Sequence, residues 1–219
     1  MPKSIIAAPS SLLLPSAAPL VPKVTLRLVS SKGDKIISDH VQPAHSWTRN
    51  FYNWLSYLCT QNLSSGSTFG AGYLSMKDVG GTIRNLPVVA MGFYNLGAVG
   101  NDAYGIVVGT GTTAESFDSY AMATKVANGT GSGQLEYRAQ KATTGAYTSG
   151  TKTWDFSLVR IFDNTSNGTI TVKETGFIIY NVNYAYYFLV CRDLLASSVD
   201  VLDDGFLTVT YTVSLQFPG

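Results

Sequence analysis

The C-terminal stretch from Phe206 to Phe217 constrains the fold of this chain more than any other segment. It reads F-L-T-V-T-Y-T-V-S-L-Q-F, with apolar residues at the odd positions from 207 onward and small or polar residues at the even positions between them. Strict alternation rich in β-branched and aromatic residues is typical of a β-strand that buries one face. Because the strand runs to within two residues of the C-terminus, its partners must come from earlier in the chain. We therefore expect an antiparallel β domain that incorporates its own C-terminal strand.

The rest of the chain predicts many short strands. Residues 23–41 have the pattern of a hairpin around Gly33, and residues 153–162 and 169–180 have the pattern of a second hairpin around N-T-S-N-G, with a bulge in its first strand. About ten to twelve short strands favour a mainly β fold, an antiparallel β-sandwich of jelly-roll-like outline, in one domain over residues 23–219. The other strands are expected at residues 73–77, 82–86, 88–94, 104–109, 135–139, 186–192 and 199–202, with a turn at 145–151.

One amphipathic helix is predicted over residues 47–61, with Ser46 as its N-cap. An apolar stripe at helical spacing is expected to pack against a sheet, and the polar side is expected to face away from it. The stripe comprises Trp47, Phe51, Trp54, Leu55 and Leu58, and the polar side comprises Arg49, Asn50 and Asn53.

Charge is scarce, since Asp, Glu, Lys and Arg make up 13% of the 219 residues and the formal net charge is +1. Such a balance provides no long-range attraction to nucleic acid or to an anionic membrane, and the sequence has no uninterrupted apolar span of the length that a membrane helix needs. A surface poor in charge and rich in hydroxyl groups is common in proteins that lie against other proteins. The two cysteines, Cys59 and Cys191, fit buried unpaired thiols, although a disulfide is possible.

The N-terminal residues 1–22 are apolar and punctuated by five prolines. They loosely resemble a signal peptide, but the prolines interrupt any helical apolar core. A segment of this kind makes too few contacts with itself to offset the entropy lost on ordering. We interpret it as an extended arm that lies across a neighbouring subunit, with the contacts made by Ile5, Ile6, Leu12, Leu13, Leu14 and Leu20.

We find no pattern of catalytic residues. The two histidines, His40 and His45, lie near the end of the first hairpin, and neither a G-x-S-x-G elbow nor an orienting acid at usable spacing accompanies the His45-Ser46 pair. No group of His, Cys, Asp and Glu has zinc-ligand spacing. Residues 109–114 imitate a phosphate-binding G-x-G-x-x-A, yet they lack the helix that such a site requires. We expect no enzyme activity and no cofactor.

Residues 163–174 contain a weak calcium-loop pattern. Four of its ligand positions are occupied, but the flanks read as strands, and about 3.3 Å per strand residue carries the last acidic residue roughly 20 Å from the loop. A plain hairpin loop is therefore the favoured interpretation. The four residues are Asp163, Thr165, Asn167 and Glu174.

Several segments together resemble virion-associated proteins of tailed bacteriophages. They are H-S-W-T-R-N-F-Y-N-W-L at 45–55, G-I-V-V-G-T-G-T-T-A at 105–114, the stretch at 119–137, the N-x-S-x-G-x-I-T-V-K-E-x-G-like residues 164–176, Arg192-Asp193, and L-T-V-T-Y-T at 207–212. The resemblance spans about residues 45–215 and carries over no catalytic residues. It implies a phage structural component located in the virion and assembled in the host cytoplasm.

The expected function is therefore that of a non-enzymatic virion protein, which decorates or connects capsid, neck or tail subunits. Its partners would be copies of itself and other virion proteins, with no nucleic acid and no membrane. Besides the arm, the polar face of the last strand is expected to bind partners through Thr208, Thr210 and Thr212. The alternative is a carbohydrate- or receptor-binding module of a phage fibre, which would use tyrosine, asparagine and aspartate side chains in loops 94–104 or 112–120.

Overall fold

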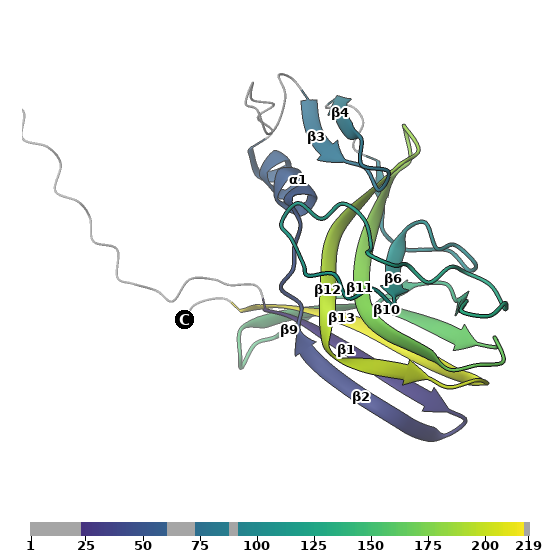
Figure 1. Cartoon of the computed structure of the whole chain (residues 1–219). Coiled ribbons are helices and arrows are strands. Elements are labelled where there is room, and N and C mark those ends of the chain that lie inside the picture. Colours follow the sequence, from purple (N-terminus) through teal and green to yellow (C-terminus); the bar gives the residue numbers. More distant parts are fainter. Residues whose placement is uncertain (1–22, 61–72, 88–91, 217–219) are drawn as a thin grey trace, which may run out of the picture.

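The computed structural model describes residues 23–60, 73–87 and 92–216. Two antiparallel sheets, of seven and four strands, pack face to face, and a helix with a two-stranded sheet lies at one end (Figure 1). Each pair of neighbouring strands among the described residues is antiparallel. The prediction of a mainly β antiparallel sandwich with one helix is confirmed. The arm, residues 1–22, lies outside the described residues.

The C-terminal strand lies in the middle of the seven-stranded sheet. The order is β2 (Lys35–Pro43), β1 (Lys23–Lys32), β13 (Gly205–Gln216), β10 (Thr153–Asn164) and β7 (Glu136–Tyr137). Two short strands, β8 (Lys141–Ala142) and β9 (Ala146–Thr148), also pair with β10. Since β13 pairs along its length with both β1 and β10, the twelve-residue alternation organises the sheet as expected.

The second sheet has the order β12 (Tyr186–Val201), β11 (Ile170–Asn181) and β5 (Phe93–Tyr94), and β6 (Gly105–Gly109) also pairs with β11. The prediction of separate strands at 186–192 and 199–202 is wrong, because β12 is continuous through both. Its pairing with β11 shifts register at Val172/Glu174 and again at Phe177/Ile178. The first shift lies opposite Leu194 and Val199, where the sequence pattern predicted a break between two strands. The bulge changes the register there, and the strand continues through it.

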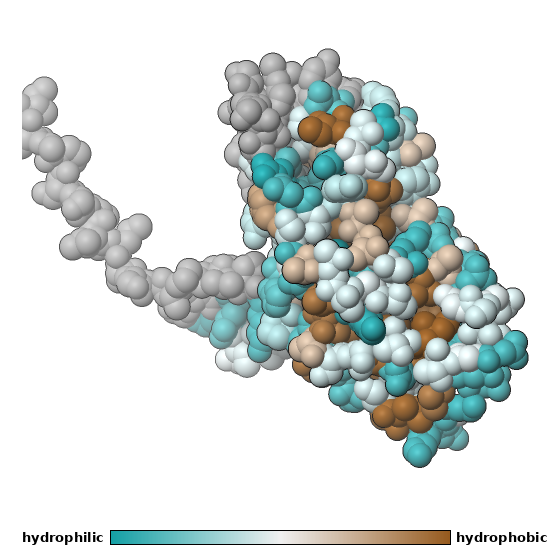
Figure 2. Space-filling model, viewed as in Figure 1, coloured by the Kyte–Doolittle hydropathy of each residue, from teal (hydrophilic) through white to brown (hydrophobic). Residues whose placement is uncertain are grey.

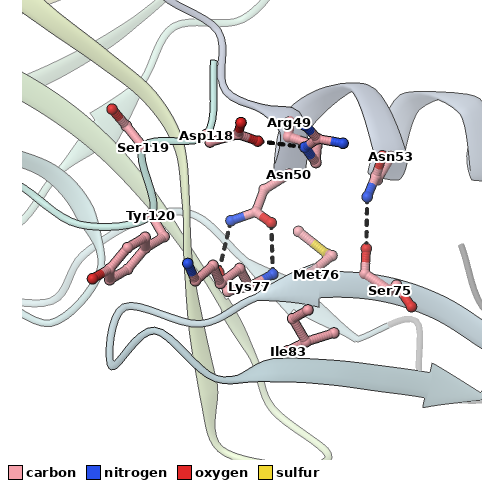
Figure 3. A pocket seen from close by; sticks show the side chains of 10 residues that line it. All are labelled: Arg49, Asn50, Asn53, Ser75, Met76, Lys77, Ile83, Asp118, Ser119 and Tyr120. Atoms are coloured by element: carbon pink, nitrogen blue, oxygen red, sulfur yellow. Dashed lines mark hydrogen bonds and ion pairs between the residues drawn. The ribbon is translucent and has the colours of Figure 1, made fainter. Parts of the chain in front are cut away.

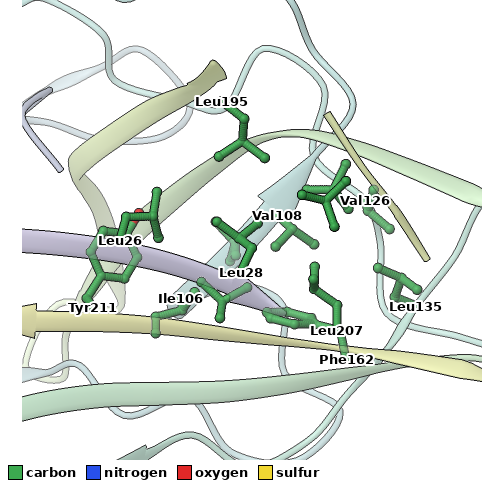
Figure 4. Close-up of a cluster of buried hydrophobic side chains, with 14 of the residues drawn as sticks. Leu26, Leu28, Ile106, Val108, Val126, Leu135, Phe162, Leu195, Leu207 and Tyr211 are labelled. Carbon is green, nitrogen blue, oxygen red and sulfur yellow. The ribbon is translucent and has the colours of Figure 1, made fainter. Parts of the chain in front are cut away.

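The core lies between the two sheets and explains the alternation of β13. Side chains from β1, β10 and β13 meet those of β6, β11 and β12 (Figure 4). Removing such large apolar side chains from water stabilises the fold by about 1.5–3 kcal/mol each. Fully buried members include Leu26, Leu28, Ile106, Val108, Leu135, Phe162, Leu207 and Val209.

The four-stranded sheet is covered on its other face as well. Leu189 and Cys191 of β12 belong to the core between the sheets, whereas Phe188 and Val190 pack with Tyr57 of α1 (Arg49–Thr60) and with the hairpin of β3 (Tyr73–Lys77) and β4 (Ile83–Pro87). A strand buried on both faces has an almost continuous apolar run rather than an alternating one. This explains the sequence Y-Y-F-L-V-C at 186–191.

The predicted orientation of the helix is partly wrong. Asn50 and Asn53, expected to face away from the sheet, are 3% and 4% exposed, whereas Leu55 and Leu58 are 42% and 48% exposed. The helix docks through hydrogen bonds to strand backbone, because Asn50 bonds the peptide N–H and C=O of Lys77. Hydrophobic periodicity cannot anticipate a helix face that docks through amides.

The helix also begins later than predicted, at Arg49, and Ser46 is not its N-cap. Residues 46–48 are extended along β12, where Arg192 N–H donates to the Ser46 carbonyl and Thr48 N–H donates to that of Val190. The Thr48 carbonyl then accepts the first bonds of the helical turn. Pairing with β12 therefore holds the Ser46 backbone outside the helix.

The hairpin predicted around N-T-S-N-G does not exist, because β10 and β11 belong to different sheets. The loop instead crosses the sandwich, and the buried Asn164 anchors it by donating to the carbonyls of Gly168 and Val201. The bulge predicted in β10 is also absent, since the register with β13 is continuous. The inward position that interrupts the apolar pattern is occupied by a buried arginine, Arg160.

Three shorter predictions need correction. Residues 146–148, expected to lie in a turn, form strand β9, and the strand expected at 135–139 is limited to Glu136–Tyr137. Of the strand expected at 88–94, only Phe93–Tyr94 is seen, and residues 88–91 lie outside the described residues. The remaining short strands, β3, β4 and β6, lie within a residue or so of their predicted positions.

Candidate functional site

Segments that are remote in sequence meet at a polar junction beside β12. We define this junction by the side chains of His45, Ser46, Glu115, Glu174, Arg192 and Asp193. It gathers pieces of all six segments that carry the phage resemblance, because Thr113 and Ala114 also bond to Arg192, Ala123 and Thr124 bond to Glu174, and Tyr211 bonds to Asp193. The junction is therefore the first candidate for a functional site.

A buried ion pair forms one half of the junction. Arg192 Nε donates to Glu174 Oε2 at 2.6 Å, and the two side chains are 3% and 0% exposed. The remaining guanidinium nitrogens of Arg192 donate to the carbonyls of Thr113 and Ala114. Glu174 also accepts from the backbone N–H groups of Ala123 and Thr124. Each charge is thus neutralised and hydrogen-bonded, as buried charges require.

The glycine-rich segment at the end of β6 passes close to this ion pair. A Cβ on either Gly109 or Gly111 would lie 2.5 Å from Glu174 Oε1. Glycine is therefore needed at both positions so that the backbone can pass close to the carboxylate. The G-x-G pattern that imitates a phosphate loop packs against a carboxylate of its own chain.

Asp193 organises the other half of the junction. Its fully buried carboxylate accepts hydrogen bonds from the backbone N–H groups of His45 and Ser46, at 3.0 and 3.2 Å, and from the Cys191 thiol at 3.1 Å. The Tyr211 hydroxyl lies 3.4 Å away. Burial, reinforced by the negative charge of Asp193, raises the pKa of both the Cys191 thiol and the Tyr211 hydroxyl well above their usual values. Cys191 is a free, buried cysteine.

An acid accompanies the His45-Ser46 pair, contrary to the interpretation of the sequence. Ser46 Oγ lies 2.5 Å from Glu115 Oε2, to which it donates, and 2.9 Å from His45 Nδ1. Glu115 Oε1 accepts from the backbone N–H of Leu194. The sequence pattern did not indicate this arrangement, because Glu115 lies 69 residues beyond Ser46. Only the packing of the loop against β12 brings them together.

The calcium-loop residues are not brought together. Asp163 forms an ion pair with Arg138 at 2.5 Å, Thr165 donates to Glu136 at 2.9 Å, and Glu174 belongs to the polar junction. The backbone N–H of Asn167, a residue in the left-handed region at φ 61°, donates to Asp203. These contacts agree with the favoured interpretation of the segment as an ordinary loop, although one that links two sheets.

Arg160 is a buried organising residue that we did not predict. Its guanidinium donates to five backbone carbonyls, and burial lowers its pKa to about 10. Four of these carbonyls belong to residues 98–106, so Arg160 holds the segment that leads into β6. The only sequence signal was a single charge at an inward position of a strand, which we interpreted as a bulge. The five carbonyls are those of Ala98, Asn101, Tyr104, Ile106 and Arg138.

A hollow of about 400 Å³ lies between the helix, the β3–β4 hairpin and residues 118–120 (Figure 3). Arg49 Nε forms an ion pair with Asp118 Oδ1 at 2.5 Å on its rim, and Lys77 Nζ lies 4.1 Å from the centroid of the Tyr120 ring. The amide of Asn50 points toward Lys77, to whose backbone it is bonded (Figure 3). The hollow thus includes residues from the 112–120 loop that the carbohydrate hypothesis singled out.

The threonines predicted to bind partners lie on the outer face of the seven-stranded sheet. Thr208, Thr210 and Thr212 are half-buried and point away from the core. Thr212 Oγ1 lies 2.8 Å from Ser157 Oγ of β10. The apolar arm residues predicted to bind partners, Ile5 to Leu20, lie outside the described residues.

No protein-family model matches this chain, and neither the curated proteins nor the solved structures contain a significant match. The likeness to phage virion proteins therefore stays a prediction from the motifs. Within the described part of the chain, no helix has the length and apolar character needed to cross a membrane.

Proposed function

We propose that this protein is a non-enzymatic structural component of a tailed-phage virion, which associates with copies of itself and with other virion proteins. The observation that carries the proposal is the outer face of the seven-stranded sheet. We define the outer sheet face by Thr25, Val29, Ser157, Val159, Ile161, Thr208, Thr210 and Thr212, which lie side by side on β1, β13 and β10.

The composition of this face suits contact with protein. Its residues are small hydroxyl or β-branched side chains, and all are half-buried. The charged side chain beside Thr210 on β1, Arg27, is engaged by Asp39 of β2 at 2.6 Å. Lys141 of β8 pairs with Val159 and is exposed, so one charge lies at the β8 edge of this face. A second subunit centred on β1 and β13 would leave Lys141 at the rim of the contact, where charged side chains can stay in water.

Apolar side chains extend the outer sheet face toward β2. Val41, which pairs with Arg27 and so lies on the same side of the sheet, is 57% exposed. Ile36 and Ile37, near the turn of the β1–β2 hairpin, are 59% and 37% exposed, and apolar surface is visible over that end of the molecule (Figure 2). Exposed apolar residues next to a face of mostly small, uncharged side chains favour an interaction surface.

The polar junction supports a structural role for its charges. Arg192 and Glu174 bond to each other and to loop backbone, and Asp193 bonds to four donors. These bonds fix loops and the start of the helix against β12. A non-enzymatic function is consistent with charges committed to holding the chain in place.

Photo-crosslinking tests the proposal. A photoreactive phenylalanine analogue at Thr210 should crosslink to a second copy or to another virion protein during infection or in isolated particles. The same analogue at Ser132, an exposed loop position, is the matched control and should give at most weak crosslinks. A protein that stays monomeric and never co-purifies with particles would overturn the proposal.

A carbohydrate-binding function is the second candidate, and one observation favours it. The rings of Tyr104, Tyr180 and Tyr187 stack on one another with centroids 4.9–6.5 Å apart, and Tyr94 adjoins them with 56% exposure. Tyrosine combines an apolar ring face with a hydroxyl group, which suits sugars. Binding to host polysaccharide that is lost on Tyr94→Ala would support this function, and its absence in the unmodified protein would dismiss it.

A further inference from the structure

His45, Glu115 and Asp193 bring one imidazole nitrogen and two carboxylate oxygens within 4.8 Å of one another. We propose that these three side chains bind a divalent transition-metal ion of the Zn²⁺ class. The inference is independent of the virion proposal, because it follows from the donor atoms alone. It also goes beyond the sequence, in which the three residues have no zinc-ligand spacing.

The distances suit a shared ion with a small adjustment. Zinc binds histidine nitrogen and carboxylate oxygen at about 2.0–2.2 Å, so two ligand atoms at a tetrahedral angle lie about 3.4 Å apart. His45 Nδ1 and Glu115 Oε2 are 3.8 Å apart, which is close to that separation. Including Asp193 requires its carboxylate or the exposed imidazole to move by roughly 1–1.5 Å.

The charge of the cluster favours a cation. Two fully buried carboxylates lie in the polar junction, and they differ in their surroundings. Glu174 is neutralised by Arg192 at 2.6 Å, whereas Asp193 has only hydrogen-bond donors, and Glu115 has no partner of opposite charge other than the imidazole of His45 among the described residues. A divalent ion would supply the positive charge that the carboxylates of Asp193 and Glu115 lack.

Solvent can reach the cluster. A hollow of about 330 Å³ is lined by His45, Ser46 and Glu115, together with the aromatic residues Trp47, Tyr52 of the helix and Phe117 of the loop after β6. The side chains of His45 and Glu115 are 62% and 24% exposed. An ion could enter from this side and keep water on its open positions, as zinc does when a protein supplies three ligands.

The mixed ligand set selects the class of ion. Imidazole nitrogen suits Zn²⁺, Cu²⁺ and Ni²⁺, whereas Ca²⁺ and Mg²⁺ prefer sites built from oxygen alone. Ser46 Oγ now bridges His45 Nδ1 and Glu115 Oε2 by hydrogen bonds of 2.9 and 2.5 Å. A bound ion would replace this bridge and join the start of the helix, the loop after β6 and strand β12.

The presence of only two histidines in the sequence makes a direct test possible. Zinc chloride titrated into ¹⁵N-labelled protein should shift the imidazole resonances of His45 and leave those of His40 unchanged. Calorimetry should show one ion per chain, with affinity at least tenfold lower for His45→Ala and Glu115→Gln. His40→Ala is the matched control and should bind zinc as the unmodified protein does. Magnesium should not compete.

Ser46→Ala separates a metal site from a simple hydrogen-bond network. It removes the bridge while keeping the ligands, so zinc should still bind and should raise the melting temperature of this variant. No shift at His45 with millimolar zinc would overturn the proposal. So would zinc binding that persists unchanged in folded His45→Ala and Glu115→Gln, or that is lost in a folded Ser46→Ala variant.

Discussion

Arg192 and Glu174 form an ion pair of 2.6 Å between two strands of one sheet, with side chains only 3% and 0% exposed. The pair does more than join β11 to β12. Arg192 holds the carbonyls of Thr113 and Ala114, while Glu174 holds the N–H groups of Ala123 and Thr124. Both ends of an irregular loop are thus fastened to one buried pair of charges.

We predict that Arg192→Met destabilises the protein by about 3–5 kcal/mol, because it leaves the Glu174 carboxylate buried without a counterion. Urea unfolding followed by circular dichroism measures the loss. Adding Glu174→Gln should recover part of it, since the amide is neutral and still accepts hydrogen bonds. Arg49→Met is the control. It removes an exposed ion pair with Asp118, which is 64% exposed, and should cost less than about 1 kcal/mol.

The helix provides a second prediction. Asn50→Leu makes the helix more apolar, yet it should destabilise the protein by about 2–3 kcal/mol, because the N–H and C=O of Lys77 lose the Asn50 amide and the carbonyl of Leu189 keeps only its bond from Thr48. The reciprocal change Leu55→Asn, at a position 42% exposed, should cost about 0.5 kcal/mol or less. The reverse ranking in thermal or urea unfolding would show that the helix docks through its apolar stripe.

The strands with simple periodicity could be predicted from sequence. In β13, β1 and β6 the burial pattern follows directly from residue type, because one face or both faces contact the core. The predictions failed where a buried polar side chain holds two elements together through hydrogen bonds to backbone. Asn50 docks a helix, Asn164 turns the chain between sheets, and Arg160 occupies an inward strand position.

The candidate site could not be predicted for a related reason. His45 and Asp193 lie 148 residues apart in sequence, with Glu115 between them, and only the path of the chain across the sandwich brings the three together. Local spacing detects ligands that share a loop or a helix. A cluster assembled by long-range pairing leaves no such pattern.

A third prediction concerns Arg160. Arg160→Met should cost about 3 kcal/mol or more, because five backbone carbonyls lose their donor in a site with 0% exposure. In Arg160→Met, amide hydrogen exchange should be accelerated, relative to the unmodified protein, more in residues 97–106 than in β13. Arg138→Met, which removes an exposed partner of Asp163, is the control and should leave that exchange nearly unchanged. Equal exchange in both variants would argue against the anchoring role.

Alkaline pH tests the environment of Cys191. Burial raises the pKa of its thiol well above the usual value of 9.0, so above pH 9 the unfolded chain releases a proton that the folded chain keeps. The stability contributed by this group is therefore complete below pH 9 and is lost as the pH rises, by up to about 1.4 kcal/mol per pH unit. Stability should fall less steeply from pH 9 to 10 in Cys191→Ala.

From pH 9 to 10 the difference in slope between the unmodified chain and Cys191→Ala isolates the thiol, because the other titrating groups are common to both proteins. Above pH 10, the raised pKa values of Tyr137 and Tyr211 also lower stability, whereas Arg160, whose pKa is lowered to about 10, acts in the opposite direction. Urea unfolding at several pH values gives the slope for each protein. Identical slopes for Cys191→Ala and the unmodified chain would contradict the assignment.

The central claim is that the outer sheet face binds other subunits, and the triple variant Thr208→Lys, Thr210→Lys and Thr212→Lys tests it most directly. Sedimentation of purified protein, alone and with particles that lack it, measures assembly, and a thermal scan confirms folding. Its matched control adds the same three charges at exposed loop positions, as Thr130→Lys, Ser132→Lys and Thr144→Lys. We predict that the control assembles like the unmodified protein, whereas the strand variant folds but stays monomeric and does not join particles. A folded strand variant that assembles normally would contradict the claim.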